Sequence, residues 1–485
     1  MMIKTLIFAT YILILFSISY YGYKASKKSV EDYFLAGRGV GVVVLVFTMF
    51  ATNFSAYFFL GFAGAGYTYG WGEYAMMSFG TGYMALILYL VAKKAWLLGK
   101  KHNYLTPPEL MGGLLRSKAV RQLYLWVMLL FTLPYVATQS FGAGELLRAV
   151  LPAPWWVGSV LITAILVGYV WAGGMRSVAW SDVVQGILMI TSLCVATSFV
   201  VLALGGYPEV GLRSYANHPE LYSRPGGLGA AGPLFTPQIW LSFMLLWAFA
   251  DPMFPQLFQR CFIGKDRRTI RTCVVLYPLI TAFLFFFPVA MGVWGRLAFP
   301  NLGVESPTII PRLLSEYTPT WVAAFVTVAG LAALMSTADS QLLVLGSMVT
   351  RDLYKTVKPG ATTEQQTRFG KSVVVFLGCL ALLITILARE HISRLQTFLV
   401  KTSFTGLAVL CPPTLAALYI RGVSAKACVL SILAGETLLA GLYTGLIPET
   451  ITFGFLWVVP VLAVTTTVLF AVILVEKLFQ VKPSV

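Results

Sequence analysis

Apolar runs of about 20 residues recur along almost the whole chain and are separated by short polar segments. An α-helix needs about that many apolar residues to cross the hydrocarbon core of a bilayer. The pattern predicts an all-α membrane protein with about thirteen transmembrane helices. We expect these helices at 5–23, 40–68, 72–94, 122–148, 155–173, 181–205, 236–259, 272–296, 320–349, 371–389, 395–420, 427–446 and 453–476.

The composition is that of a chain that mostly avoids water. Of the 485 residues, 58% are hydrophobic and 11% are charged, whereas soluble domains have about 25% charged residues. No segment is typical of an appended soluble module, so residues 1–485 are expected to form one transmembrane domain. The run at 5–23 has only Lys4 before it and no clear small-residue cleavage site. It is therefore interpreted as a retained helix rather than a signal peptide.

Basic residues are divided unequally between the two sides of the predicted bundle. One side collects 26 of the 35 lysines and arginines, the other collects eight, and Lys401 falls inside a span. The positive-inside rule produces such a split, and here it places the N-terminus outside and the C-terminus in the cytoplasm of a cell (inner) membrane protein. Topology thus accounts for the net charge of +16, and no basic face with stacking aromatics indicates nucleic-acid binding.

Cysteine, histidine and candidate catalytic residues change this picture little. The six cysteines show no CxxC spacing, and the three histidines stand isolated in predicted loops. Neither a disulfide framework nor a cysteine–histidine metal site is expected. No nucleophile–base pair stands out in the spans, so an enzyme is not expected and no catalytic residue is assigned.

Two of the predicted spans are interrupted near bilayer depth. The second carries Ala51-Thr52-Asn53-Phe54-Ser55, and the seventh carries Asp251-Pro252 and Pro255. Proline removes a backbone donor, and unwound backbone at this depth is tolerated only where it is buried in protein or lines a cavity. The breaks lie five helices apart, so the five-helix units that begin there would have opposite orientations.

Inverted repeats with broken first helices are typical of transporters that bind a solute at the breaks. The repeats are expected over 40–205 and 236–420, with 5–23 as an extra N-terminal helix and 427–476 as two C-terminal helices. Ordinary proline kinks in a helical bundle are the alternative.

The ninth span contains four polar side chains within five positions, namely Ser336, Thr337, Asp339 and Ser340. Residues three or four apart share a helix face, and an acidic residue inside a membrane indicates function. Hydroxyls facing the free carbonyls of a broken helix would suit a hard cation such as sodium. The alternative is that these hydroxyls bond back to carbonyls of their own helix.

A second polar segment, Gly173 to Gly186, joins two spans on the predicted cytoplasmic side. Its glycines permit a tight turn. Ser181 is expected to cap the next helix, with Asp182 as a first-turn acid that complements the helix dipole. The functional alternative is that Asp182 guards the inner mouth of a cation path.

The segment Gly-Gly-Met-Arg-Ser-Val-Ala-Trp-Ser-Asp-Val-Val-Gln-Gly resembles the signature of the sodium:solute symporter family. Three further segments are similar to ones found in that family, and the matches follow its order over nearly the whole chain. They are Asp32 to Arg38, Gln256 to Arg260 and Met335 to Leu343.

The resemblance implies a LeuT-type core of two inverted five-helix repeats that works by alternating access, with sodium as the transported ion. The implied sodium ligands are the carbonyls of Ala51, Phe54 and Ala333 and the hydroxyls of Ser336 and Thr337. Some relatives hold a second sodium, for which the matching positions are Asp182, Ser336, Asp339 and Ser340. Because Asp339 replaces a hydroxyl of those relatives, it is alternatively a proton site or a residue that tunes the first site.

The solute is less well defined than the ion. Tyr57, Phe58 and Phe59 follow the second-helix break where sugar-transporting relatives have polar residues, which argues against a sugar. Leu133 to Gln139 and the aromatic second helix favour a small carboxylate. Lys401 is expected either to pair with such an anion or to snorkel to the outer surface. The candidate substrate residues are Asn53, Ser55, Tyr57, Phe58, Gln139, Trp247 and Asp251.

The expected function is therefore sodium-coupled import of a small carboxylate across the lipid bilayer. A sodium/proline or other amino-acid symporter is the first alternative, although proline-transporting relatives carry an acid where this chain has Asn53. A proton-coupled carrier and a transporter-derived sensor are further alternatives. The oligomeric state is not predicted.

Overall fold

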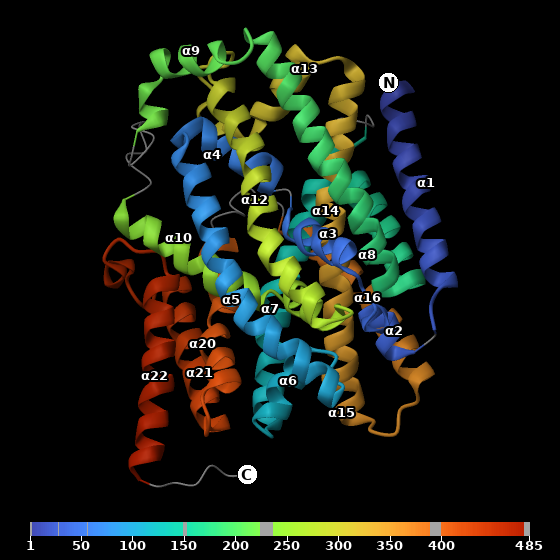
Figure 1. The fold of residues 1–485 in the computed structure, drawn as a ribbon, viewed down its shortest axis with the longest axis vertical. Coiled ribbons are helices and arrows are strands. Elements are labelled where there is room, and N and C mark those ends of the chain that lie inside the picture. The colour runs from blue at the N-terminus through green and yellow to red at the C-terminus, as the bar shows by residue number, and fades with distance from the viewer. Residues whose placement is uncertain are drawn as a thin grey trace.

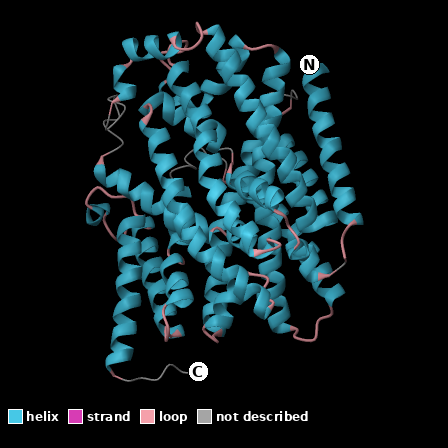
Figure 2. Ribbon diagram, in the orientation of Figure 1, coloured by secondary structure: helices cyan, strands magenta, loops and turns pink. Residues whose placement is uncertain are grey.

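Helices make up nearly all of the regular structure in the computed structural model, which describes residues 2–27, 29–55, 57–148, 153–223, 236–388 and 399–479. Within these residues the only other regular feature is an isolated bridge between Val40 and Gly264. Figure 2 shows the resulting all-helical bundle. The all-α prediction is confirmed.

Ten helical segments of the described chain are long and apolar enough to cross a membrane. They are α1 (Met2–Lys24), α5 (Gly72–His102), α7 (Lys118–Leu147), α8 (Trp155–Ala203), α12 (Arg267–Gly295), α14 (Thr320–Met348) with its extension to Val357, α16 (Thr363–Leu387), Leu399–Tyr419, α21 (Ala425–Tyr443) and α22 (Val458–Leu478). The segment Leu399–Tyr419 comprises η7 (Leu399–Phe404), α19 (Thr405–Ala408) and α20 (Cys411–Tyr419).

The predicted number of thirteen spans is not confirmed. The bent pair formed by α10 (Pro237–Ala250) and α11 (Pro255–Ile263) raises the number of candidates to eleven. The helix α3 (Val42–Asn53) is too short to count by itself. The 49 residues of α8 would extend about 74 Å as one straight helix, more than twice the ~30 Å hydrocarbon core. Its backbone is not helical at Gly174, where two helices meet.

Short helices cover the two ends of the bundle. In Figure 1, α9 (Glu209–Asn217) and α13 (Ile309–Tyr317) lie at the end where the chain begins. The opposite end carries α2 (Val30–Leu35), α6 (Pro107–Leu114), α15 (Lys355–Val357) and the C-terminus. The two termini thus lie at opposite ends of the bundle, while the assignment of one end to the cytoplasm remains a prediction.

The centre of the bundle is α14. Every residue from Val328 to Met348 is buried, which includes the polar segment Ser336 to Gln341. A membrane helix that is buried on all sides must be surrounded by other helices, and α14 packs against α1, α3, α7, α8 and α16. Its polar side chains therefore face protein groups, and these groups form the candidate site.

The turn expected near Gly173 lies at Gly174, whose φ of 58° and ψ of −147° suit glycine alone. The turn is held by Arg176, which pairs with Asp32 at 2.6 Å. Burial raises the pKa of the Asp32 carboxyl, but Arg176 and the backbone N–H of Lys27 outweigh burial, so the pKa lies below its usual value. Asp32 therefore stays ionised and keeps the ion pair.

The capping role predicted for Ser181 is wrong. The helix that follows Gly174 runs through Ser181 without interruption, and the Ser181 hydroxyl donates to the Val178 carbonyl at 2.9 Å within that helix. Asp182 is consequently far from a helix N-terminus and is fully buried. The helix begins after the turn at Gly174, so no cap is required at Ser181.

Replacing Gly174 by alanine should lower the thermal stability of the detergent-solubilised protein. A side chain at this φ and ψ costs about 1–3 kcal/mol, and its Cβ would overlap the carbonyl oxygen of Tyr33. Gly168→Ala is the matched control because nothing lies within 4 Å of that position in the same helix. Equal melting temperatures for the two variants would contradict this account of the turn.

Candidate functional site

The first break follows α3, which ends at Asn53. Phe54 is extended, with φ −87° and ψ 116°, and the helix resumes as the π segment η2 (Tyr57–Gly61) followed by α4 (Phe62–Tyr69). The last carbonyls of a helix have no partner within it. The carbonyls of Ala51 and Phe54 therefore need donors from elsewhere in the protein.

Two hydroxyls of α14 supply these donors. Ser336 donates to the Ala51 carbonyl at 2.8 Å, and Thr337 donates to the Phe54 carbonyl at 2.9 Å. The same hydroxyls lie 2.9 and 3.1 Å from the carbonyl of Ala333. Back-bonding within α14 and contact with the broken helix thus occur together. All five residues predicted for the sodium site meet in one buried cluster of oxygen atoms.

The second break lies between α10 and α11, which are bent by 54°. The connecting turn η4 (Asp251–Met253) contains Pro252, and Phe254 leads into Pro255 at the start of α11, so the break lies where the sequence predicts it. The break exposes the side chain of Asp251 to a cavity in the middle of the bundle. Asp251 itself is only 6% exposed.

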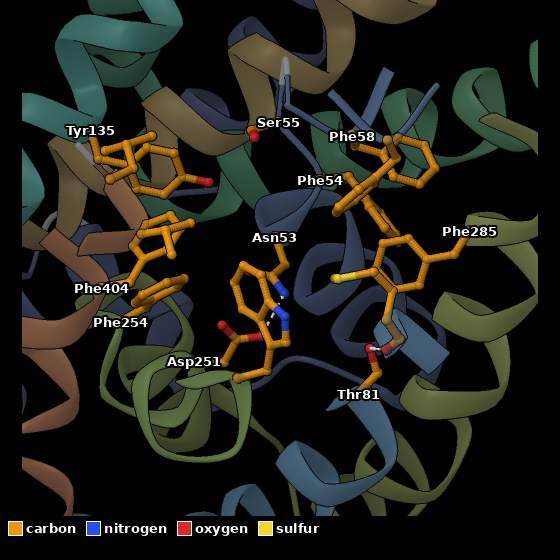
Figure 3. Close-up of a pocket in the computed structure, with 15 residues that line it drawn as sticks. Asn53, Phe54, Ser55, Phe58, Thr81, Tyr135, Asp251, Phe254, Phe285 and Phe404 are labelled. Atoms are coloured by element: carbon orange, nitrogen blue, oxygen red, sulfur yellow. Dashed lines mark hydrogen bonds between the residues drawn. The ribbon is translucent and has the colours of Figure 1, made fainter. Parts of the chain in front are cut away.

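Residues of both breaks line this cavity. Figure 3 shows Phe54, Phe58 and Phe285 gathered on one side and Tyr135, Phe254 and Phe404 on the other. Asn53 and Asp251 lie between these groups. The remaining lining residues are Ser55, Phe62, Met77, Thr81, Trp247, Leu399 and Val400. The mostly apolar lining with a few polar groups is typical of small-molecule sites.

Asn53 joins the two breaks directly. Its amide donates to the Asp251 carboxylate at 3.2 Å and to the hydroxyl of Tyr277 on α12 at 2.7 Å. The other carboxylate oxygen of Asp251, Oδ1, is buried and has no partner among the described residues, and the same holds for the indole Nε1 of Trp247. Buried polar atoms are normally paired, so both atoms are candidates for contact with a solute.

Most of the predicted substrate residues line the cavity. Asn53, Ser55, Phe58, Trp247 and Asp251 do so. Gln139 does not, because it lies in a separate small cavity, and its amide donates to the hydroxyl of Thr138 at 3.0 Å. The side chain of Tyr57 lies outside the described part of the structure.

The cavity also contains aromatic residues that the sequence did not identify, namely Tyr135, Phe254, Phe285 and Phe404. The chain has many aromatic residues in its predicted spans, and periodicity does not show which of them face a cavity rather than lipid. Sequence reasoning singled out the segment Leu133 to Gln139, which is the correct part of α7. Within that segment it chose Gln139 as a substrate residue, whereas Tyr135 lines the cavity.

A buried charge network lies beside the oxygen cluster. The guanidinium of Arg260 on α11 bonds to the carboxylate of Asp182 at 3.0 Å and to the hydroxyl of Ser340 at 2.6 Å. Ser340 also donates to the Asp339 carboxylate at 2.9 Å, and Tyr169 donates to that carboxylate at 2.5 Å. The arginine and both acids are 0% exposed.

Sequence reasoning gave Arg260 no role, although it belongs to a segment that matched the family. The signal was present, because a charged residue within a membrane span is usually paired and functional. Arg260 also donates to the carbonyl and the hydroxyl of Thr48 at 3.0 and 2.9 Å. Thr48 in turn donates to Asp182. One arginine thus connects α3, α8, α11 and α14.

Lys401 does not line the cavity. Its ammonium pairs with Glu449 at 2.8 Å and lies 4.9 Å from the ring centre of Trp457. The hydrogen bond from Lys401 lowers the pKa of the Glu449 carboxyl below its usual value. This contact agrees with the snorkelling alternative and removes Lys401 as a partner for an anionic solute.

A helical membrane protein with two broken helices around a buried cavity has the architecture of a solute transporter. The sequence pattern of the sodium:solute symporter family matches residues 33–435, and this chain belongs to that family.

Among curated proteins, the chain is 27% identical over 439 residues to the sodium/pantothenate symporter of Escherichia coli (strain K12), covering 90% of this chain and 89% of that protein. It is 26% identical over 372 residues to the high-affinity proline transporter of Bacillus subtilis (strain 168), covering 76% and 75%.

Solved structures show the same fold. A substrate-bound, outward-open Na⁺-coupled sialic acid symporter matches with a TM-score of 0.78 and 21% identity over 96% of each chain. MHP1, a nucleobase-cation-symport-1 family transporter, matches with a TM-score of 0.61 and 14% identity over 92% of this chain and 94% of that one. The LeuT-like fold expected from the sequence is thus confirmed.

Arg260→Met should destabilise the protein strongly, because it leaves the Asp182 carboxylate buried without its cationic partner. Breaking a buried ion pair typically costs about 3–5 kcal/mol. The double variant Arg260→Met/Asp182→Asn should lose less stability than Arg260→Met alone. Unfolding in mixed detergent micelles would measure both losses.

The control for these two variants is Arg368→Met. Arg368 and Glu364 form an exposed ion pair, 80% and 82% accessible, whose loss should change stability by less than about 1 kcal/mol. If the double variant lost as much stability as Arg260→Met, the proposed pairing with Asp182 would not explain the loss.

Proposed function

We propose that this chain is a sodium-coupled symporter that imports a small organic solute by alternating access. The observation that carries the proposal is the meeting of three backbone carbonyls and two hydroxyls, from Ala51, Phe54, Ala333, Ser336 and Thr337, at the break that borders the cavity. Membership of the sodium:solute symporter family supports it. The chain is a transporter rather than an enzyme, and its partners are sodium, the solute and the lipid bilayer.

The chemistry of the cluster favours sodium. Hard cations prefer oxygen ligands, and the five ligands are all uncharged oxygen atoms, which suits a monovalent ion. The hydroxyls of Ser336 and Thr337 now donate to carbonyls. Rotation of each hydroxyl would turn its lone pairs toward the ion, so the same five atoms can alternate between mutual hydrogen bonds and ion ligation.

Coupling follows from the position of Phe54. Its carbonyl belongs to the oxygen cluster, while its ring lines the cavity. Sodium binding would fix the extended backbone at Phe54 and thereby position the ring and its neighbour Asn53 for the solute. By linkage, the solute would then raise the affinity for sodium by the same factor.

A second sodium at Asp182, Ser336, Asp339 and Ser340 remains a separate proposal. Asp182, Asp339 and Ser340 lie in one network, but Ser336 bonds to the Ala51 carbonyl in the first cluster. The two repeats, the inner-membrane location and the cytoplasmic C-terminus are likewise proposed from the sequence pattern. Proton coupling is the main alternative to sodium, and uptake driven separately by sodium and proton gradients distinguishes them.

The double variant Ser336→Ala/Thr337→Ala should weaken sodium binding more than it weakens folding. Each lost contact with a charged group is worth about 1.5–3 kcal/mol, so apparent sodium affinity should fall by more than about tenfold. The affinity can be measured from the rise in melting temperature as sodium replaces potassium, because a ligand that binds the native state stabilises it.

Thr385→Ala is the matched control. Thr385 is also buried, and its hydroxyl donates to the Ala137 carbonyl of another helix at 2.7 Å, away from the oxygen cluster. This variant should keep the full sodium-induced rise. A double variant with undiminished sodium stabilisation, or with undiminished sodium stimulation of solute uptake in proteoliposomes, would show that the ion binds elsewhere.

A further inference from the structure

The charge of the cavity indicates the chemistry of the solute. Among its 15 described lining residues, Asp251 is the single charged side chain, and none is a lysine, arginine or histidine. Lys401, the basic residue considered for an anionic solute, is held by Glu449 outside the cavity. A carboxylate solute without a cationic group would therefore meet a second carboxylate in a poorly hydrated space, which is unfavourable.

The geometry of Asp251 leaves one carboxylate oxygen for a ligand. Asn53 donates to Oδ2, while Oδ1 is buried without a partner among the described residues. Removing a charged oxygen from water without a donor is costly, so a donor supplied by the solute would satisfy it. Figure 3 shows the Asp251 carboxylate beside Asn53 in the space between the two aromatic groups.

Two further features match a cationic group that is joined to a hydrogen-bond acceptor. The rings of Phe54, Phe254, Phe285 and Phe404 line the cavity, and aromatic faces attract ammonium groups. The indole N–H of Trp247, which precedes Asp251 by about one helical turn, has no partner among the described residues. A solute that places an ammonium group on Asp251 would offer an acceptor, such as its own carboxylate, to Trp247.

We propose that the transported solute is a small amino acid or related zwitterion whose protonated amine binds Asp251. This inference rests on the proposed symport function and specifies its substrate class. It replaces the simple carboxylate expected from the sequence. In this chain the acidic residue of the cavity is Asp251, which belongs to the second break. Asn53 of the first break positions its carboxylate through a hydrogen bond.

Three matched pairs of compounds test this inference on the purified full-length protein. Each pair keeps the carbon skeleton and differs in the amine: L-alanine and propionate, L-proline and cyclopentanecarboxylate, L-phenylalanine and 3-phenylpropionate. Melting temperatures are measured in sodium chloride and in potassium chloride. At least one amino acid should raise the melting temperature in sodium, and its amine-free partner should not. If no amino acid does so, or if an amine-free partner stabilises the protein equally, the inference is overturned.

Asp251→Asn should abolish the shift caused by the amino acid and keep the shift caused by sodium alone, which also shows that the variant is folded. Asp266→Asn makes the same chemical change at an exposed helix cap and should keep both shifts. An unchanged amino-acid shift in Asp251→Asn overturns the role of this residue. If sodium did not raise the melting temperature of the wild-type protein, the proposed symport function would be contradicted instead. Failure of the solute inference and failure of the symport proposal are therefore distinguishable.

Discussion

Backbone polar groups at bilayer depth must find partners within the protein, and this constraint organises the centre of the molecule. The break after α3 leaves the carbonyls of Ala51 and Phe54 without partners in their own helix. Ser336 and Thr337 satisfy both from α14. A helix can present hydroxyls at this depth only if other helices surround it, and α14 is buried without interruption from Val328 to Met348. The broken helix and the central helix therefore depend on each other.

The oxygen cluster and the cavity lie on two sides of the same break. Phe54 contributes its carbonyl to one and its ring to the other, and Asn53 extends the connection to Asp251 in the second broken helix. The two half-helices on either side of this second break, α10 and α11, differ in direction by 54°, and α11 carries the buried Arg260 that bonds to Asp182. A few adjoining side chains thus connect the proposed ion site, the proposed solute site and the second broken helix.

The sequence predicted features that arise from local chemistry. The breaks at Asn53 to Ser55 and at Asp251-Pro252 follow from polar residues and proline in apolar runs, and the structure has both. The pairing of Ser336 and Thr337 with the first break was expected from family resemblance. Features that depend on packing were missed. The rotation of α7 places Gln139 in a separate cavity. Ser181 lies inside the helix that follows Gly174 instead of at its start. The partners of Arg260 come from three other helices.

The burial of Arg260 has a consequence for biogenesis. An arginine at the middle of a membrane helix costs about 2.5–3.5 kcal/mol during insertion by the translocon. Its carboxylate partner, Asp182, and its contact at Thr48 both precede it in the chain. The ribosome therefore delivers these two acceptors to the membrane before α11 emerges, whereas the third, Ser340 on α14, follows later. The order of the residues along the polypeptide thereby offers Arg260 a carboxylate and a threonine as soon as α11 enters the membrane.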